Sequence, residues 1–326
     1  MRTTSIGPVT AALLVGACHP CPDGVLHGSL FIDNSEISSD DGWGTLDDTP
    51  VAECREISGS LVISGRISTL RPFDGLERIG GTLLFRNAYG IEDIDGFEEL
   101  RAAGGLEFNE IERETLTGDQ LAPGEQRVLA ISGLNSLVEI PGDLTLEHTD
   151  IRSVTGLQSL ERIGGSAWLW FSPLTGLEGL SNMQAIGGSL YARGTGADLQ
   201  VLSRLRTIGR NLDTLGIDVE GTLGLSALET IGGDAYVIDV RGLQTVGMPA
   251  LETVGGELFL TSLSELEHLD GLGSLRQVDG DLRVAGNRTL SSDEVRAWAE
   301  TLDVTGDIII CSNRPPDVDC NDLTAP

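Results

Sequence analysis

The stretch Ile186-Gly187-Gly188-Ser189-Leu190 recurs along the chain, as Ile79-Gly80-Gly81-Thr82-Leu83, Ile163-Gly164-Gly165, Ile231-Gly232-Gly233 and Val254-Gly255-Gly256-Glu257-Leu258. Degenerate copies begin at Gly28, Gly59, Gly104, Gly142, Arg210, Gly280 and Gly306. From Gly59 on, the units follow at steps of 22 to 26 residues, except for one step of 38 after Gly104. A period of this length is typical of a solenoid with one coil per unit. The sequence therefore predicts about twelve coils, with insertions after Gly28 and Gly104.

The unit that begins at Gly142 indicates how each coil is built. Leu144 and Leu146 alternate with polar residues, as in a strand with one buried face. Apolar residues then recur about every third position, which suits short turns that each direct one side chain inward; they are Ile151, Val154, Leu157, Leu160 and Ile163. The doubled glycine suits a corner that needs a positive φ or a close backbone approach. We expect a mainly β fold, a single elongated, right-handed parallel β-solenoid over residues 28–320.

The composition fits such a core and excludes several classes of function. Apolar residues make up 40% of the 326 residues and aromatic residues 4%, so aliphatic side chains must fill the interior. The chain has no lysine, which excludes Schiff-base chemistry and the phosphate-binding P-loop. The net charge of −29 argues against a nucleic-acid partner, because phosphates would be repelled.

The chain begins with features of an export signal. One arginine, a short apolar run and small residues describe a secretory signal peptide over residues 1–17, too short to remain as a membrane span. Val15-Gly16-Ala17-Cys18 resembles the bacterial lipobox, and the resemblance implies that Cys18 becomes a lipidated N-terminus. The alternatives are a plain signal peptide cut nearby or an ordinary buried cysteine. With a lipid anchor, residues 18–27 would be anchor and linker, and the protein would be exported to the outer membrane or the cell surface.

Four cysteines remain besides Cys18, namely Cys21, Cys54, Cys311 and Cys320. An even number in an exported chain suggests two disulfides, for which three pairings exist. Because two cysteines lie near each end of the solenoid, Cys21–Cys54 and Cys311–Cys320 are the favoured bonds.

The segment Leu290–Leu302 differs from the repeats. Ser291 and Glu294 can form a capping box, and Val295, Trp298 and Leu302 share one helical face. We expect a short C-terminal helix that packs on the last coils, followed by a tail over residues 321–326.

The repeat units resemble a known family. The run Cys54-Arg55-Glu56-Ile57-Ser58-Gly59-Ser60-Leu61-Val62-Ile63, followed by Leu70, Phe73, Leu76 and Ile79-Gly80-Gly81, is similar to the receptor L domain, the leucine-rich, β-helix-like ligand-binding module of insulin- and epidermal-growth-factor-type receptors. The resemblance extends from Cys21 to about Cys320 and implies the fold. The chain departs from the family in its lipobox, its long uninterrupted array, and its lack of a kinase and of a cysteine-rich partner domain. The hormone-binding role is therefore not implied.

Motifs for catalysis or metal binding are weak in this sequence. It contains neither Gly-x-Ser-x-Gly nor His-Glu-x-x-His. His148 and His268 have flanking acids, but no nucleophile is near them in sequence. The acidic loop Asp40–Asp48 could bind Ca²⁺ through carboxylate oxygens, yet it lacks EF-hand spacing and reads more simply as a solvated loop. We expect no cofactor and no metal site.

The best functional lead is the row of residues that should point outward from the strands. Counting the second glycine of each unit as position 0, positions 2 and 4 point inward and positions 3 and 5 outward. The outward positions hold a predicted binding ladder of Trp168, Trp170, Tyr191, Arg193, Tyr236 and Phe259. An apolar stripe on a polar surface usually marks an interaction site, although a covering loop or β pairing could also explain it.

The sequence thus favours a lipid-anchored, non-enzymatic protein that binds a protein or a carbohydrate through its sheet face. A β-helix enzyme acting on polysaccharide is the first alternative, and a purely structural envelope protein is the second.

Overall fold

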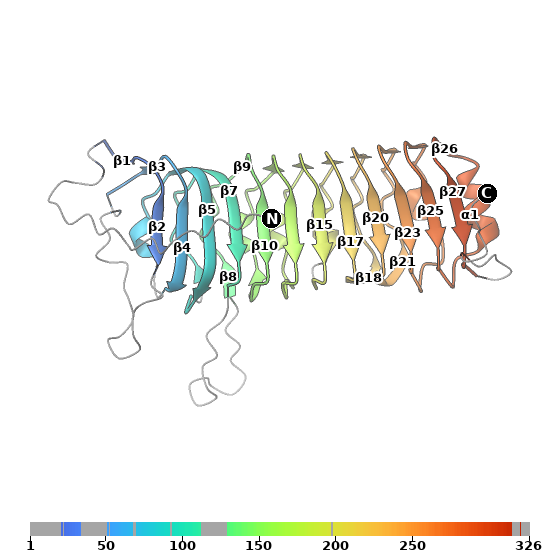
Figure 1. Ribbon diagram of the computed structural model, residues 1–326, viewed down its shortest axis with the longest axis horizontal. Helices are drawn as coiled ribbons and strands as arrows, with labels where there is room; N and C mark the ends of the chain where they lie inside the picture. The colour runs from blue at the N-terminus through green and yellow to red at the C-terminus, as the bar shows by residue number, and fades with distance from the viewer. Residues whose placement is uncertain are drawn as a thin grey trace, which may run out of the picture.

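The computed structural model shows one elongated stack of coils with the strands of successive coils side by side (Figure 1). The structure describes residues 21, 23–33, 51, 53–67, 70–91, 93–111, 129–196, 198–314 and 320. Every strand pair in these residues is parallel. The mainly β class and the parallel β-solenoid predicted from the repeat are confirmed.

The largest sheet, here called the main sheet, runs the length of the stack. Its fourteen strands are β1 (Val25–Leu26), β2 (Leu30–Asp33), β3 (Glu56–Ile57), β4 (Leu61–Arg66), β5 (Arg78–Tyr89), β7 (Ala102–Asn109), β10 (Leu144–Glu147), β13 (Ala167–Trp170), β15 (Leu190–Arg193), β17 (Leu212–Leu215), β20 (Ala235–Ile238), β23 (Leu258–Thr261), β25 (Leu282–Ala285) and β27 (Ile308–Cys311).

Three smaller sheets and short helices complete the coils. An eight-stranded sheet contains β9 (Glu139–Ile140), β12 (Arg162–Ile163), β14 (Ala185–Ile186), β16 (Thr207–Ile208), β19 (Thr230–Ile231), β22 (Thr253–Val254), β24 (Gln277–Val278) and β26 (Asp303–Val304). A three-stranded sheet contains β6 (Asp93–Ile94), β8 (Leu129–Ile131) and β11 (Ile151–Ser153). A two-stranded sheet pairs β18 (Asp218–Thr222) with β21 (Arg241–Thr245). The three-residue spacing corresponds to 3-10 turns, namely η2 (Arg71–Phe73), η3 (Thr155–Leu157), η4 (Glu178–Leu180), η5 (Leu199–Leu202) and η6 (Asp270–Leu272).

The predicted count of twelve coils is slightly high. Twelve strands of the main sheet carry positions 2 to 5 of the repeat, but twelve strands enclose at most eleven turns. Residues 34–50, between β2 and β4, and residues 112–128, between β7 and β10, lie outside the described part of the chain. The solenoid therefore has about ten turns.

The predicted inside and outside of the main sheet are correct. Leu144, Leu146 and Leu258 have no exposed surface, whereas Thr145 and Glu147 between and after them are half-buried on the outer face. Parallel pairing places equivalent residues side by side, as for Thr145 and Trp168. The outward positions therefore form continuous rows along the solenoid.

The doubled glycines let the backbones of neighbouring coils approach closely, which is one of the two roles predicted for them. None of the Ile-Gly-Gly or Val-Gly-Gly pairs has a positive φ. A Cβ at Gly187 would collide with the carbonyl of Gly164 in the preceding coil, and one at Gly165 with the Asp143 carboxylate. Asp143 lies in that space because its Oδ1 accepts a hydrogen bond from the Ser166 N–H at 2.7 Å. The second glycine therefore leaves room for a side-chain oxygen that ties two coils together.

Positive φ recurs instead at position 6, which follows the main-sheet strands directly from β7 on and lies near the end of β4 and β5. Glycine takes this position at Gly194, Gly216 and Gly286, but larger residues take it elsewhere, including His148 and Phe171. A bulky residue with positive φ is uncommon and carries local strain.

The helix and both disulfides were also predicted. Helix α1 (Ser292–Ala299) is shorter than the predicted segment and buries Val295 and Ala299. The capping box is wrong, because Ser291 makes no side-chain cap and the Glu294 carboxylate accepts a 3.4 Å hydrogen bond from the Leu269 N–H instead. Cys21–Cys54 and Cys311–Cys320 are bonded, with Cα–Cα distances of 5.5 and 5.1 Å. Among the described residues, no helix has the length and apolar character that a membrane crossing needs.

Candidate functional site

The six residues of the predicted ladder lie on the outer face of the main sheet. Trp168 and Trp170 lie on β13 beside Tyr191 and Arg193 of β15, and their Cα register is Trp168 with Tyr191 and Trp170 with Arg193. Tyr236 of β20 pairs with Phe259 of β23. The two groups are separated by β17, whose residue at position 3 is Asp213. The stripe predicted from the sequence, whose ring positions are interrupted at Asp213, therefore consists of two clusters.

The first group, here called the tryptophan cluster, comprises Trp168, Trp170, Tyr191 and Arg193. The Trp168 and Tyr191 rings stack with centroids 4.0 Å apart and planes 17° from parallel. Trp170 stands edge-on to Trp168, with centroids 5.0 Å apart. The Arg193 guanidinium lies 5.5 Å from the Trp170 ring centroid, close enough for a cation–π interaction. All four side chains are half-buried, so the cluster is packed yet reaches solvent.

Arg193 also forms a two-pronged ion pair with Asp213 on the next strand. Its Nε donates to Asp213 Oδ1 at 3.0 Å, and its Nη2 donates to Oδ2. The Asp213 side chain is only 9% exposed, so the arginine covers a carboxylate that would otherwise be buried alone. This hydrogen bond raises the pKa of Arg193, which keeps its charge. The pair holds the guanidinium in place beside the rings.

The second cluster consists of Tyr236, Phe259 and Glu257. The two rings meet edge to face with centroids 5.3 Å apart. The Tyr236 hydroxyl donates to Glu257 Oε2 at 2.9 Å. Burial and this hydrogen bond raise the pKa of Tyr236, so its phenol stays neutral. The hydrogen bond to Glu257 therefore holds the Tyr236 ring in place, and the neutral phenol does not act as a base.

One polar atom in the tryptophan cluster lacks a partner. The indole Nε1 of Trp170 is buried and has no hydrogen-bond acceptor in the described structure. A buried, unmade hydrogen bond costs about 1–3 kcal/mol. The ring is therefore kept in this position at some expense to stability.

Sequence reasoning missed Phe171, which is 58% exposed at the edge of the same face. Its ring stacks on His148 with centroids 5.3 Å apart. Both residues take position 6, where the backbone has positive φ. Alternation within a strand says nothing about the corner that follows it, so only the repeated position itself could have drawn attention to this pair.

The ion-pair partners of His148 and His268 in the described part of the chain are carboxylates. The His148 Nδ1 lies 3.5 Å from Glu147 Oε1, and the His268 Nδ1 lies 3.4 Å from Glu294 Oε1 of α1. The second partner is not one of the acids that flank His268 in sequence. Both histidines are well exposed.

The predicted lipid anchor and the acidic loop considered for Ca²⁺ fall in parts of the chain that the structure does not describe. Within the described residues, no three His, Cys, Asp or Glu side chains gather as a metal site would require. The acidic loop at 40–48 and the predicted lipidation site Cys18 lie outside those residues.

Comparisons with known proteins add no relative. No protein-family model matches the chain, and no curated protein resembles it closely enough to count as a match. Likeness to the receptor L domain stays a prediction based on the quoted repeat residues.

Proposed function

We propose that the protein is exported, held to the cell envelope by lipid on Cys18, and binds a partner without catalysis through the outer face of its main sheet. The observation that carries the binding role is the tryptophan cluster. Trp, Tyr and Arg dominate the energy of protein interfaces, and they occur here together on a regular β surface. The ion pair to Asp213 fixes their positions in advance, which lowers the entropy cost of binding.

The geometry favours a protein partner over a glycan. Sugars bind aromatic residues through an open ring face, but Trp168 and Tyr191 each have one face covered by the other ring. Trp170 meets both rings edge-on. The cluster thus has less free ring face to offer a sugar, whereas protein side chains can pack between ring edges.

Partner capture tests the binding role. The chain from residue 18 with Cys18→Ser would be immobilised, and retained proteins identified and titrated against the variants. Trp168→Ala with Tyr191→Ala should abolish capture, because it removes the stacked pair. The matched control is Phe31→Ala, which removes a ring that is 64% exposed on the same face but far along the stack. Equal capture by the double variant and the wild type would contradict the proposal.

Membrane fractionation tests the anchor separately. Cys18→Ser in the full chain should move the protein from the membrane to the soluble fraction. Membrane association of this variant, with no lipid on the wild type, would show that Cys18 is no anchor and would leave the binding role untouched.

The alternative of a polysaccharide-degrading enzyme draws no comparable support. Such enzymes need free acids and a cation together on one outer face. Asp213 and Arg193 are an acid and a cation side by side on this face, but they are bonded to each other, so the Asp213 carboxylate is not free. Release of reducing sugar by the wild type, and its loss in Asp213→Asn, would favour the enzyme instead.

A further inference from the structure

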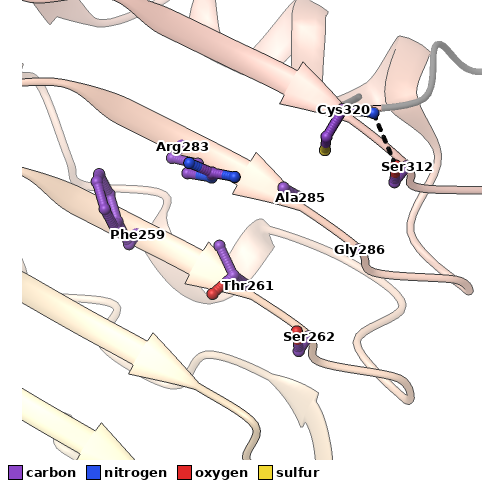
Figure 2. A pocket seen from close by; sticks show the side chains of 8 residues that line it. All are labelled: Phe259, Thr261, Ser262, Arg283, Ala285, Gly286, Ser312 and Cys320. Carbon is purple, nitrogen blue, oxygen red and sulfur yellow. Dashed lines mark hydrogen bonds between the residues drawn. The ribbon is translucent and has the colours of Figure 1, made fainter. Parts of the chain in front are cut away.

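A small pocket lies at the C-terminal end of the main sheet's outer face (Figure 2). Its volume is about 320 Å³, within the lower range for small-molecule sites. Its lining comes from β23, β25, the residues directly after β23, β25 and β27, and the disulfide-bonded Cys320. It comprises Phe259, Thr261, Ser262, Arg283, Ala285, Gly286, Ser312 and Cys320.

The pocket exists because the middle coil has small residues where its neighbours are larger. Ala285 and Gly286 take positions 5 and 6 of β25, between Thr261-Ser262 and Cys311-Ser312. At the same position 5, Leu215 and Ile238 stand on β17 and β20. A Cβ added at Gly286 would meet nothing closer than 3.6 Å. The small side chains of Ala285 and Gly286 therefore leave room for the hollow in this coil.

Three hydroxyl groups line the hollow. The backbone N–H groups of Ser262 and Gly286 already donate to Ala285 and Cys311 carbonyls at 3.0 and 3.1 Å, so the side chains are the groups left to bind a ligand. Ser312 Oγ accepts from the Cys320 N–H at 3.1 Å and keeps its own hydrogen to donate (Figure 2).

The two serines occupy strained corners. Ser262 and Ser312 have φ values of 60° and 53°. Among the described position-6 residues with positive φ, serine occurs only at these two corners, which flank Gly286. Non-glycine residues in this conformation cost energy and gather at functional sites.

Arg283 is the only charged residue among those that line the pocket. No carboxylate in the described structure forms an ion pair with it, unlike Arg193 with Asp213. Acids stand at position 1 of this coil and of both neighbouring coils, namely Glu257, Asp281 and Asp307. Glu257 Oε2 accepts from the Tyr236 hydroxyl at 2.9 Å, and Asp281 Oδ1 accepts from the Asp307 N–H at 2.8 Å. In Figure 2 the guanidinium extends along the strand toward Ala285. The pocket thus carries a positive charge, whereas the chain as a whole has a net charge of −29.

We propose that this pocket binds a sugar acid, a monosaccharide-sized molecule or chain unit with a carboxylate. Arg283 holds the carboxylate by charge-assisted hydrogen bonds. The hydroxyls of Thr261, Ser262 and Ser312 bond the sugar hydroxyls, and the Phe259 ring contacts an apolar face of the sugar. This site is separate from the tryptophan cluster, so it can exist whether or not that cluster binds a protein.

Ligand-observed NMR titration of the intact protein in detergent tests the proposal, with D-glucuronate and D-glucose as probes. Glucuronate should bind saturably at millimolar concentration, and glucose, which lacks the carboxylate, at least about ten-fold more weakly. Arg283→Gln should weaken glucuronate binding by about ten-fold or more. Arg210→Gln is the matched control, since it removes the same charge from an exposed site far from the pocket, and it should change little.

A second variant tests the pocket without altering charge. Ala285→Leu should fill the hollow and abolish binding, and leucine is compatible with the fold because β17 has Leu215 at that position. A polymer of glucuronate that binds more tightly than the free sugar would assign the site to a chain, and equal affinity per unit would assign it to the free acid.

Four results would overturn the proposal: no saturation with glucuronate up to ~10 mM, glucose binding as tightly as glucuronate, unchanged affinity in Arg283→Gln, or displacement of glucuronate by an equal concentration of inorganic phosphate. The last would indicate a general anion site. None of these results bears on partner capture by the tryptophan cluster.

Discussion

The coils between β4 and β7 and the coils from β13 on differ in where most of their aromatic rings lie. Between β4 and β7 four phenylalanine rings lie inside: Phe73, Phe85, Phe97 and Phe108 have at most 1% of their surface exposed, whereas Tyr89 at the end of β5 is 37% exposed. Phe73 stacks on Phe97 at 5.4 Å, and Phe85 on Phe108 at 5.5 Å. From β13 on, aliphatic side chains fill the coils, Trp298 of α1 packs against this core, and the rings on the main-sheet strands stand on the outer face.

This difference separates two reasons for an aromatic residue. Inside, a ring contributes burial and packing, so its presence needs no functional explanation. Outside, the tryptophan cluster gains only part of that burial and retains an unpaired indole N–H. Stability alone does not account for such an arrangement, which supports the proposal that the outer rings bind a partner.

The largest effect should come from the inner rings. Phe97→Ala removes a ring that contacts both Phe73 and Phe85, and should reduce the free energy of unfolding by about 3–5 kcal/mol. Denaturant unfolding followed by circular dichroism measures it. A loss below about 1 kcal/mol would mean that the inner stack is loosely packed, and the comparison between the two regions would fail.

The next effect tests the inside and outside of the later coils directly. Leu146→Ala should cost about 2–5 kcal/mol, because this buried side chain has no exposed surface. Its strand neighbour Thr145 points outward, and Thr145→Ala should cost under about 0.5 kcal/mol. The same denaturant titration compares them, and a reversed ranking would shift the sheet register by one residue.

The sequence was sufficient to predict this register because alternation and period both depend on local residues. It predicted the solenoid, the disulfides and the outward placement of Trp168 and Tyr236. The interruption of the ladder at Asp213 could be predicted from its position in the repeat. The bond between Asp213 and Arg193 could not, because that contact depends on side-chain reach across strands. The pocket was also missed, since Ala285 and Gly286 look unremarkable in sequence and form a hollow only between two particular coils.

Smaller losses should follow from the outer rings. Trp168→Ala should reduce the free energy of unfolding by about 1–2 kcal/mol, from the lost stack on Tyr191 and part of its buried area. Trp170→Phe is the informative companion, because it keeps a ring but removes the unpaired N–H, and should cost less. Thermal and denaturant melts measure both. A Trp168→Ala loss as large as that of Phe97→Ala would make the outer ring a core residue and weaken the binding argument.

The smallest effect concerns Glu107, which takes position 3 on β7, at the junction between the two regions. Burial raises the pKa of its carboxyl above the ordinary value of 4.5, and the nearby Asp143 charge raises it further. The folded protein therefore binds a proton more readily than the unfolded chain, so ionised Glu107 lowers stability as the pH rises from 4.5 through the folded-state pKa.

Glu107→Gln should consequently be slightly more stable than the wild type at pH 7, and the difference should vanish below pH 4.5, where the carboxyl is protonated in both states. Denaturant unfolding across this pH range measures the difference. Asp143→Asn is the matched background, since its amide oxygen can still accept from the Ser166 N–H while the charge is gone. In that background the gain from Glu107→Gln should shrink but persist, because burial is the larger cause. A gain that disappears entirely would show that charge repulsion alone acts on Glu107, and a loss of stability at pH 7 would show that the carboxylate makes a favourable contact on this face.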